Sequence, residues 1–311
     1  MDNVRDLVER ARAGEPRAVA RLISWVEDGS PALAEVMSLI ADRAGSARVI
    51  GVTGPPGVGK STMTSALVRA WRERGIRVGV IAVDPTSPFS GGALLGDRIR
   101  MHDHATDPGV FIRSMASRGH LGGLAATTPQ AVRILEAAGC DVVIVETVGV
   151  GQSEVEVAST ADSTLVLLAP GMGDGIQAAK AGILEIGDVL SVNKADRDGA
   201  SSTARELSHM LGLADRPDGA WVPRVVTSVA SRGDIDAVLE ALDEHARWLA
   251  DSGILAQRRR RRAAEEVLAI AMARIRDRWV GSSTLDSLAE EVAKGERDPF
   301  AAAEELRRHL D

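Results

Sequence analysis

A short segment, Gly54 to Thr62, constrains the fold of this chain more than any other part of the sequence. It reads GPPGVGKST and matches the pattern G-x-x-x-x-G-K-[ST], in which backbone N–H groups wrap around phosphate oxygens. The strand-like run ARVIGVT precedes it and the helix-like run STMTSALVRAWRERG follows it, which is the context that such a loop requires. The segment therefore predicts a phosphate-binding loop between a buried strand and a helix.

The residues of this loop have distinct expected roles. Lys60 is expected to bridge the β- and γ-phosphates of a nucleotide, and the Ser61 hydroxyl to coordinate Mg²⁺. The helix that begins there adds partial positive charge at its N-terminus, which favours bound phosphate. The nucleotide-binding residues predicted in this loop are Gly54, Pro55, Pro56, Gly57, Val58, Gly59, Lys60, Ser61 and Thr62.

Short apolar runs alternate with amphipathic segments through the middle of the chain. The candidate strands are ARVIGVTG, IRVGVIAVD, GVFIRS, DVVIVET, STLVLLA, DVLSVN and PRVVTS. The segments between them are long enough for crossover helices, and this alternation is typical of a mostly parallel sheet. We therefore predict an α/β fold, a P-loop NTPase domain with three α/β/α layers, over residues 46–250.

Helical extensions are expected on both sides of that domain. Residues 1–45 carry apolar side chains at helical spacing, and residues 251–311 continue the chain with an apolar helical stripe. Such a stripe is buried either on its own domain or on a second copy, and we favour a dimerisation arm and a homodimer. The run Arg258 to Arg262 is expected to be a solvated helix start, since Glu265 and Glu266 follow it.

Composition bears on the partners and the compartment. A net charge of -7 and a pI of about 5.5 disfavour nucleic acid as a partner, because polyanion binding needs a basic surface. The single cysteine, Cys140, permits no intrachain disulfide, and no apolar run reaches the length of a membrane span. The N-terminus alternates charges where a signal peptide would be apolar, so we expect a cytoplasmic protein with no membrane partner.

The tetrapeptide NKAD predicts which base is bound. Its residues Asn193, Lys194 and Asp196 fit the N-K-x-D pattern of guanine-specific proteins. A carboxylate at Asp196 accepts hydrogen bonds from guanine N1–H and the N2 amino group, whereas adenine presents an acceptor at N1. Lys194 is expected to lie over the base and Asn193 to link neighbouring loops. Ser228 is expected to offer its backbone N–H to guanine O6, with Val229 beside it, so the expected ligands are GTP and GDP.

Acidic residues near likely strand ends are candidates for the carboxylates around Mg²⁺. They are Asp84 in AVDPTSP, Asp97 in LLGDRIR and Glu146 in VIVETVG. Strands carry Asp84 and Glu146 toward the carboxyl edge of the sheet, where ligands of open α/β folds bind, although each acid also fits an ordinary loop. We predict that Lys60, Asp84 and Glu146 are catalytic.

The run ETVG occupies the place of the usual D-x-x-G and predicts a nucleotide switch. Gly149 is expected to donate its N–H to the γ-phosphate and to order the loop that follows. Val150 stands where Ras-like GTPases carry a water-orienting glutamine, and its side chain makes no hydrogen bond. We therefore expect slow hydrolysis that a partner accelerates, with Gln152 and Glu154 as local switch residues.

These motifs together resemble the MeaB/ArgK family of methylmalonyl-CoA mutase-associated GTPases, of the SIMIBI class. The resemblance is carried by GPPGVGKST, VDPTSPFSGGALLGDRIRM, VFIRSMASRGHLGGLA, VETVGVGQSE and NKAD. It implies a homodimeric GTPase that binds adenosylcobalamin-dependent methylmalonyl-CoA mutase, gates cofactor loading, and protects or reactivates that enzyme. It also implies that Gln177 and Lys180 convey the nucleotide state, whereas spacing alone indicates solvated helix residues. The loop SVAS departs from the usual Ser-Ala-Leu type, which affects the geometry at guanine O6.

Other function classes remain open. A metallochaperone GTPase needs thiols or histidine clusters, and this chain has one cysteine and six histidines, of which His102 and His104 form an H-x-H in a polar stretch. An ArgK-type kinase or ATPase linked to amino-acid transport would use ATP, against which NKAD argues. A scaffold that binds GTP only structurally would show no nucleotide-dependent change in partner affinity.

Overall fold

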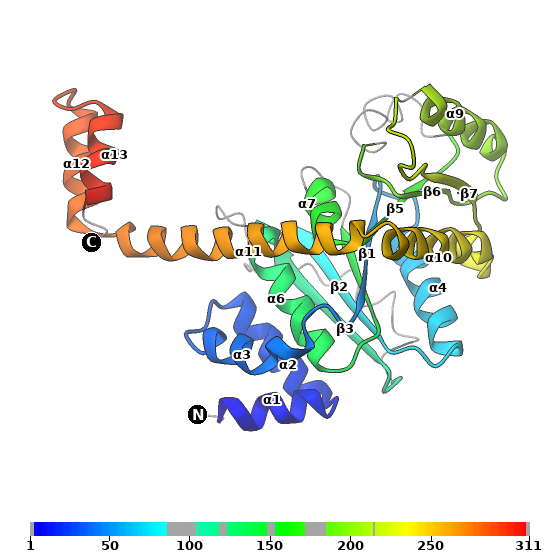
Figure 1. Ribbon diagram of the computed structural model, residues 1–311, viewed down its shortest axis with the longest axis horizontal. Coiled ribbons are helices and arrows are strands. Elements are labelled where there is room, and N and C mark those ends of the chain that lie inside the picture. The colour runs from blue at the N-terminus through cyan, green and yellow to red at the C-terminus, as the bar shows by residue number, and fades with distance from the viewer. Residues whose placement is uncertain are drawn as a thin grey trace. The chain divides into compact units, whose positions relative to one another are not determined.

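The computed structural model divides the chain into two compact units, Met1–Arg262 and Ala263–Asp311 (Figure 1). The residues that it describes are 3–85, 104, 106–117, 123–147, 153–171, 185–213 and 215–308. No helix within these ranges has the length and apolar character needed to cross a bilayer. The nucleotide motifs that the structure describes all belong to the first unit.

A seven-stranded parallel sheet forms the centre of the first unit, as far as the described residues show. Its strands are β1 (Arg48–Thr53), β2 (Val78–Pro85), β3 (Val110–Ser117), β4 (Val142–Thr147), β5 (Ser163–Leu168), β6 (Val189–Val192) and β7 (Arg224–Thr227). They lie in the order β3-β2-β4-β1-β5-β6-β7. β4 and β5 are buried at every position. Because helices cover both of their faces, most of their residues are apolar without alternation.

Helices cover both faces of this sheet (Figure 1). The helices of the first unit are α1 (Val4–Arg12), α2 (Pro16–Glu27), α3 (Leu33–Ile40), α4 (Lys60–Glu73), α6 (Gly123–Ala137), α7 (Ser153–Thr160), α9 (Ala200–Leu213) and α10 (Asp236–Asp251), with α11 (Ile254–Trp279) beginning there. Along β2, Val78 and Val80 pack with α4 and α10, whereas Ile81 and Val83 pack with α6. The predicted three-layer α/β/α fold is confirmed.

The N-terminal extension is helical, as predicted, and shares a core with the sheet. Leu22 and Ile23 of α2 are each 1% exposed and belong to the same apolar cluster as Ile134 of α6. Arg113 of β3 also donates to Ser24 Oγ at 3.0 Å and pairs with Glu27. Because α1 to α3 bury their apolar faces on α6 and β3, they are integral to the first unit.

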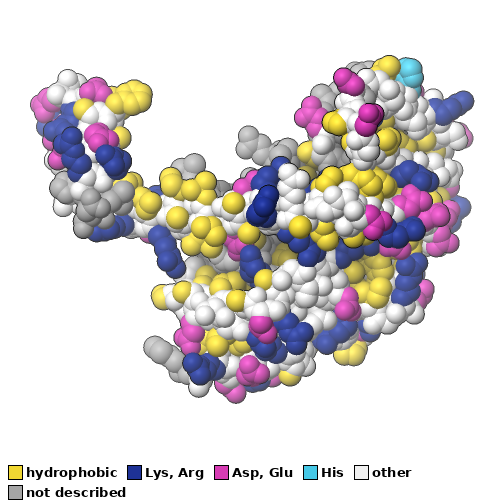
Figure 2. Space-filling model, in the orientation of Figure 1, with side chains coloured by type: hydrophobic (Ala, Val, Ile, Leu, Met, Phe, Trp, Pro, Cys, Tyr) yellow, Lys and Arg dark blue, Asp and Glu magenta, His cyan; other side chains and the backbone are white. Residues whose placement is uncertain are grey.

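The second unit is helical and carries large apolar side chains that are exposed. It contains the later part of α11, followed by α12 (Ser283–Ala293) and α13 (Pro299–Arg308). Ser282 caps α12 by accepting a hydrogen bond from Leu285 N at 3.2 Å. Figure 2 shows apolar side chains gathered along α11. The exposed large apolar residues of this unit are Val267, Leu268, Met272, Val280 and Phe300.

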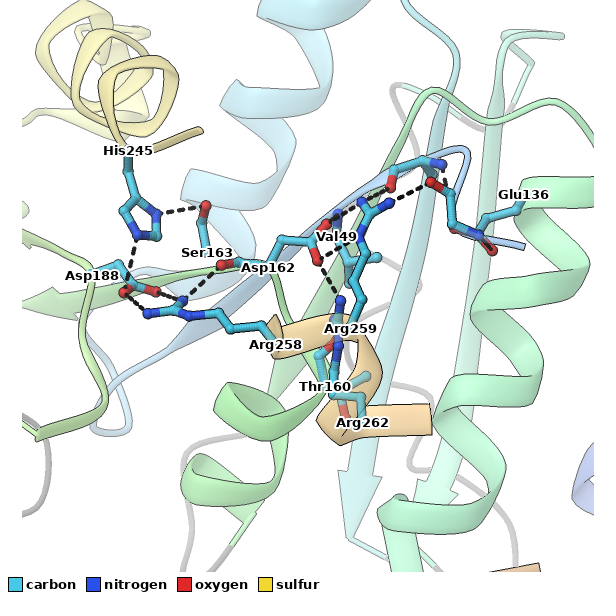
Figure 3. Close-up of polar contacts among 12 residues, drawn as sticks. Val49, Glu136, Thr160, Asp162, Ser163, Asp188, His245, Arg258, Arg259 and Arg262 are labelled. Carbon is cyan, nitrogen blue, oxygen red and sulfur yellow. Dashed lines mark hydrogen bonds and ion pairs between the residues drawn. The ribbon is translucent and has the colours of Figure 1, made fainter. Parts of the chain in front are cut away.

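Arginines at the start of α11 bind carboxylates at the amino ends of β5 and β6 (Figure 3). Arg258 pairs with both oxygens of Asp188, at 2.9 and 3.1 Å. Arg259 Nη2 lies 2.8 Å from Asp162 Oδ2, and Arg262 also pairs with Asp162, which is 2% exposed. We call these five side chains the arginine clamp. The prediction that these arginines are solvated is therefore wrong. Hydrophobic periodicity does not show that the carboxylates of Asp162 and Asp188, which precede β5 and β6, lie beside them.

A buried histidine extends the arginine clamp. His245 of α10 is 0% exposed; its Nδ1 lies 2.8 Å from Ser163 Oγ and its Nε2 lies 3.3 Å from Asp188 Oδ1. Burial lowers the pKa of His245 to about 4, although the charge of Asp188 opposes this shift. Its ring also packs against Trp221 and Trp248, with ring centroids 4.8 and 5.8 Å away, and these two rings contact each other. The imidazole is therefore neutral at pH 7.

Candidate nucleotide site

The predicted phosphate loop lies between β1, which ends at Thr53, and α4, which begins at Lys60. Its three glycines, Gly54, Gly57 and Gly59, all have positive φ, and at two of them a side chain would also clash. A Cβ on Gly54 (φ 141°) would lie 2.2 Å from the Leu167 carbonyl oxygen, and one on Gly59 (φ 98°) would lie 2.6 Å from Asn193 Nδ2. The loop is thus packed tightly against the neighbouring strand ends and is shaped by its own backbone.

Lys60 and Ser61 turn into the interior at the first turn of α4. Lys60 Nζ donates to the carbonyl oxygens of Gly54, at 2.7 Å, and Pro55, at 3.0 Å. Ser61 Oγ donates to Glu146 Oε1 at 2.7 Å, and Glu146 at the end of β4 is 2% exposed. Hydroxyl and carboxylate oxygens are ligands that Mg²⁺ accepts. The structure therefore brings two predicted metal ligands together at the carboxyl edge of the sheet.

The strand register places the backbone of Asp84 at the same edge of the sheet. On β2, Ala82 pairs with Glu146 of β4, and Asp84 follows two positions later on a strand that runs parallel to β4. Glu154 lies in the first turn of α7. The side chains of Asp84 and Glu154 are outside the described part of the structure. Also outside the described residues are Asp97, Gly149, Val150, Gln152, Gln177, Lys180 and His102.

Asn193 joins the phosphate loop to the loops beyond β6 and β7. Its Nδ2 donates to the Val58 carbonyl oxygen at 2.8 Å, and its Oδ1 accepts from Ala230 N at 3.1 Å. Ser228 Oγ also donates to Asn193 Oδ1, at 3.3 Å. Because Asn193 is 3% exposed, these bonds form away from competing water. One buried amide thus holds the phosphate loop and the predicted base-binding loops in a fixed relation.

Lys194 and Asp196 lie on the more exposed side of this loop. Lys194 Nζ donates to the Gly57 carbonyl oxygen at 2.6 Å, and its φ of 59° is positive, as is otherwise seen only at glycines in the described residues. Asp196 Oδ2 lies 3.1 Å from Arg232 Nη2. No sequence motif marks Arg232; only its place a few residues after Ser228 hints at a role in this site.

The expected role of Ser228 needs a correction. Its backbone N–H, which was predicted to face guanine O6, donates to the Val192 carbonyl oxygen at 3.0 Å. Its hydroxyl lies 2.8 Å from Ser191 Oγ, and the next N–H, from Val229, donates to the Asp234 carbonyl oxygen at 2.9 Å. The side-by-side pairing of β6 and β7 extends through Ser228 and uses the donor that the prediction assigned to the base.

Comparisons with known proteins find relatives over most of the chain. Residues 19–284 match the family model described as methylmalonyl Co-A mutase-associated GTPase MeaB. A Pyrococcus horikoshii protein named as a GTPase is 46% identical over 98% of this chain and 97% of its own length. The Escherichia coli GTPase ArgK is 40% identical over 83% of this chain and 80% of its own length.

A mammalian relative and a solved structure extend the comparison. The mouse protein named methylmalonic aciduria type A homolog, mitochondrial, is 39% identical over 68% of this chain and 52% of its own length. The crystal structure of an LAO/AO transport system kinase superposes with a TM-score of 0.74 and is 29% identical, covering 99% of this chain and 97% of that one. The similarity therefore spans both the sheet and the helical extensions.

Proposed function

Because this chain belongs to the MeaB family of methylmalonyl-CoA mutase-associated GTPases, we propose that it is a GTP-hydrolysing chaperone of adenosylcobalamin-dependent methylmalonyl-CoA mutase. In this role it gates cofactor loading and protects or reactivates the mutase. The name of the mouse relative, which refers to methylmalonic aciduria, supports a link to that enzyme. GTP hydrolysis is the chemistry that we propose for this chain.

The contact between Asn193 and Val58 carries the nucleotide part of this proposal. It fixes the N-K-x-D loop against the phosphate loop, so one ligand is able to touch both. In the proposed complex, the phosphates lie on the Gly54–Thr62 backbone and guanine bonds to Asp196. Lys60 leaves the carbonyl oxygens that hold it and turns to the β- and γ-phosphates.

The donor set at the carboxyl edge fits Mg²⁺. Ser61 and Glu146 supply oxygen atoms within hydrogen-bond distance of each other, and Asp84 and Asp97 are the proposed further carboxylates. Held by these oxygen atoms, Mg²⁺ would supply positive charge against the charge that develops on the phosphates during hydrolysis. We propose that Lys60, Asp84 and Glu146 act together in catalysis, and that Gly149 senses the γ-phosphate.

The partner is proposed to complete the site. The residue after Gly149 is Val150, which is unable to orient water, so slow turnover alone and faster turnover with the mutase are expected. Gln152, Glu154, Gln177 and Lys180 are proposed to convey the nucleotide state to that partner. The exposed apolar side chains of the second unit are proposed to form a homodimer contact.

The metallochaperone alternative finds no support in the described residues. They contain no group of three or more His, Cys, Asp or Glu side chains placed to hold a metal ion. His104 Nε2 lies 3.0 Å from Ser65 Oγ and 3.2 Å from the Ser65 carbonyl oxygen, so it is engaged in the fold. A transport-linked kinase would have to use ATP, and Asp196 is the residue that argues against adenine.

The test is GTP turnover by the purified chain with and without a cobalamin-dependent acyl-CoA mutase. Stimulation by the mutase that disappears in Lys60→Ala supports the proposal, as does the absence of ATP turnover. Turnover that no such mutase changes would remove the partner and leave the GTPase. Rapid turnover by the isolated chain would contradict the proposed need for a partner.

A further inference from the structure

Arg232 lies beside the carboxylate that is proposed to read guanine. Its Nη2 atom is 3.1 Å from Asp196 Oδ2, and the two residues come from different loops at the carboxyl edge of the sheet. The side chain of Asp196 is 34% exposed and that of Arg232 is 69% exposed. Asp196 is therefore open to a ligand, and Arg232 is the cation that pairs with it in the described structure.

The loop that carries Arg232 has a fixed backbone. Val229 and Asp234 form an isolated antiparallel bridge, with Val229 N donating to the Asp234 carbonyl oxygen at 2.9 Å. Gly233 closes the loop with a φ of 77°. Ala230 N is bonded to Asn193 Oδ1 at 3.1 Å, which ties this loop to the loop of Asp196. The backbone of Arg232 is thus held at one distance from the predicted base-binding loop.

Resting on the proposed function, we propose that Arg232 is a positioning residue of the guanine site, which holds the Asp196 carboxylate in the orientation that the base needs. A carboxylate has about four lone-pair positions, so one N–H from Arg232 leaves room for both guanine donors. An isolated aspartate loses rotational freedom when it binds the base. Pairing with Arg232 removes part of that freedom in advance and strengthens binding.

The alternative role for Arg232 is competition with guanine for Asp196. If Arg232 occupied the place of the base edge, guanine would have to displace it, and removal of Arg232 would tighten nucleotide binding. The single contact to Oδ2 favours positioning over competition, because the pair leaves Asp196 Oδ1 without a bond to Arg232. The two roles predict opposite signs in one measurement.

The experiment measures binding and dissociation of fluorescent GDP by the full chain. Arg232→Ala is expected to weaken GDP binding about fivefold through faster dissociation. This fold-change corresponds to the upper limit of the contribution of an exposed ion pair. Arg232→Lys, which retains a positive charge, is expected to restore most of the affinity. Arg224→Ala is the matched control, since Arg224 pairs with Glu244 and lies on β7 before the loop.

A double-mutant cycle separates positioning from a general effect on the fold. Asp196→Asn is expected to convert the preference from guanine to xanthine, because an amide donates to the O2 atom that xanthine carries. In that background, Arg232→Ala is expected to leave xanthosine diphosphate binding unchanged, since no ion pair remains. An equal loss in both backgrounds would show that Arg232 is merely structural.

The outcomes also separate this inference from the proposed function. If Arg232→Ala binds GDP as tightly as the wild type or more tightly, the positioning role is overturned. If the wild type itself binds GDP, the guanine site still stands. Failure of the wild-type chain to bind GDP would overturn the proposed function and the inference with it.

Discussion

Glu146 stands where switches of the D-x-x-G type carry an aspartate, and its side chain reaches Ser61 Oγ at 2.7 Å. The sequence identifies this residue, because an apolar strand leads directly to it. The sequence does not show the hydrogen bond, since it joins residues that are 85 positions apart. The same limit applies to Ser228, whose N–H was assigned to a base although strand pairing already uses it.

Glu146→Gln tests the charge at this position. The amide keeps an oxygen that accepts from Ser61 but carries no negative charge, so Mg²⁺ affinity is expected to fall by about 10- to 100-fold. The measurement is the Mg²⁺ concentration that gives half-maximal GTP turnover. Glu136→Gln is the control, because Glu136 is also buried but bonds to Gly45 N and Ala47 N, on other segments of the fold. An equal shift in both variants would contradict a metal role for Glu146.

His245 makes stability depend on pH in a definite direction. Its folded-state pKa of about 4 lies below the ordinary value of 6.5, so the unfolded chain binds more protons between these values. Stability is therefore complete above about pH 6.5 and falls as the pH decreases toward 4. The ring contacts Asp188, Ser163, Trp221 and Trp248, and the charges of Arg258 and Arg48 also lower its pKa, whereas that of Asp162 raises it.

Denaturant unfolding at pH 7 and pH 5 measures this contribution. The wild-type free energy of unfolding is expected to fall by about 2 kcal/mol more than that of His245→Gln, which has no titrating ring. Equal losses in the two proteins would show that His245 does not titrate on unfolding in this range.

At the scale of elements, continuous apolar runs predict the strands, and the helical segments between them appear as α4, α6, α9 and α10. The arginine clamp is the feature that pattern analysis misses at this scale. Burial alone would raise the pKa of Asp162, but the hydrogen bond from Arg259 and the charges of Arg262 and Arg259 outweigh it and lower the pKa. Only the folded sheet brings these arginines to that carboxylate.

Arg259→Ala tests the clamp. It leaves Asp162 buried with one cation fewer, and the free energy of unfolding is expected to fall by about 3 kcal/mol, as for a broken buried ion pair. Arg260→Ala is the matched control, because Arg260 is exposed and adjacent, and it is expected to change stability by less than about 0.5 kcal/mol. Chemical unfolding at pH 7 measures both, and similar values for the two variants would contradict the clamp.

At the scale of the whole molecule, the phosphate loop and the α/β alternation predict the P-loop fold, and the helical spacing of apolar residues predicts the extensions. The domain limits follow less directly: the expected arm began at residue 251, whereas the compact units divide after Arg262. The difference has a physical cause, since the first turns of α11 are bound to the sheet by charged pairs that leave no trace in hydrophobic periodicity.

Leu268→Glu tests the proposed dimer. Leu268 is 62% exposed in the single chain, and Val267 and Met272 are 67% and 57% exposed. A charge at the centre of a contact between copies is expected to convert the dimer to a monomer in sedimentation velocity, because it buries an unpaired carboxylate. Gln257→Glu, which places the same charge earlier on α11, is expected to leave the dimer intact. A wild-type monomer would contradict the proposal.

The arginine clamp also determines where the C-terminal arm of this chain can be exchanged for that of a related protein. An exchange of C-terminal arms between relatives at residue 251 would remove this chain's own arginines from Asp162 and Asp188, although every described nucleotide residue would remain. An exchange after Arg262 would keep both carboxylates paired. The start of α11 is therefore part of the fold of the sheet domain, and a junction for such an exchange belongs after Arg262.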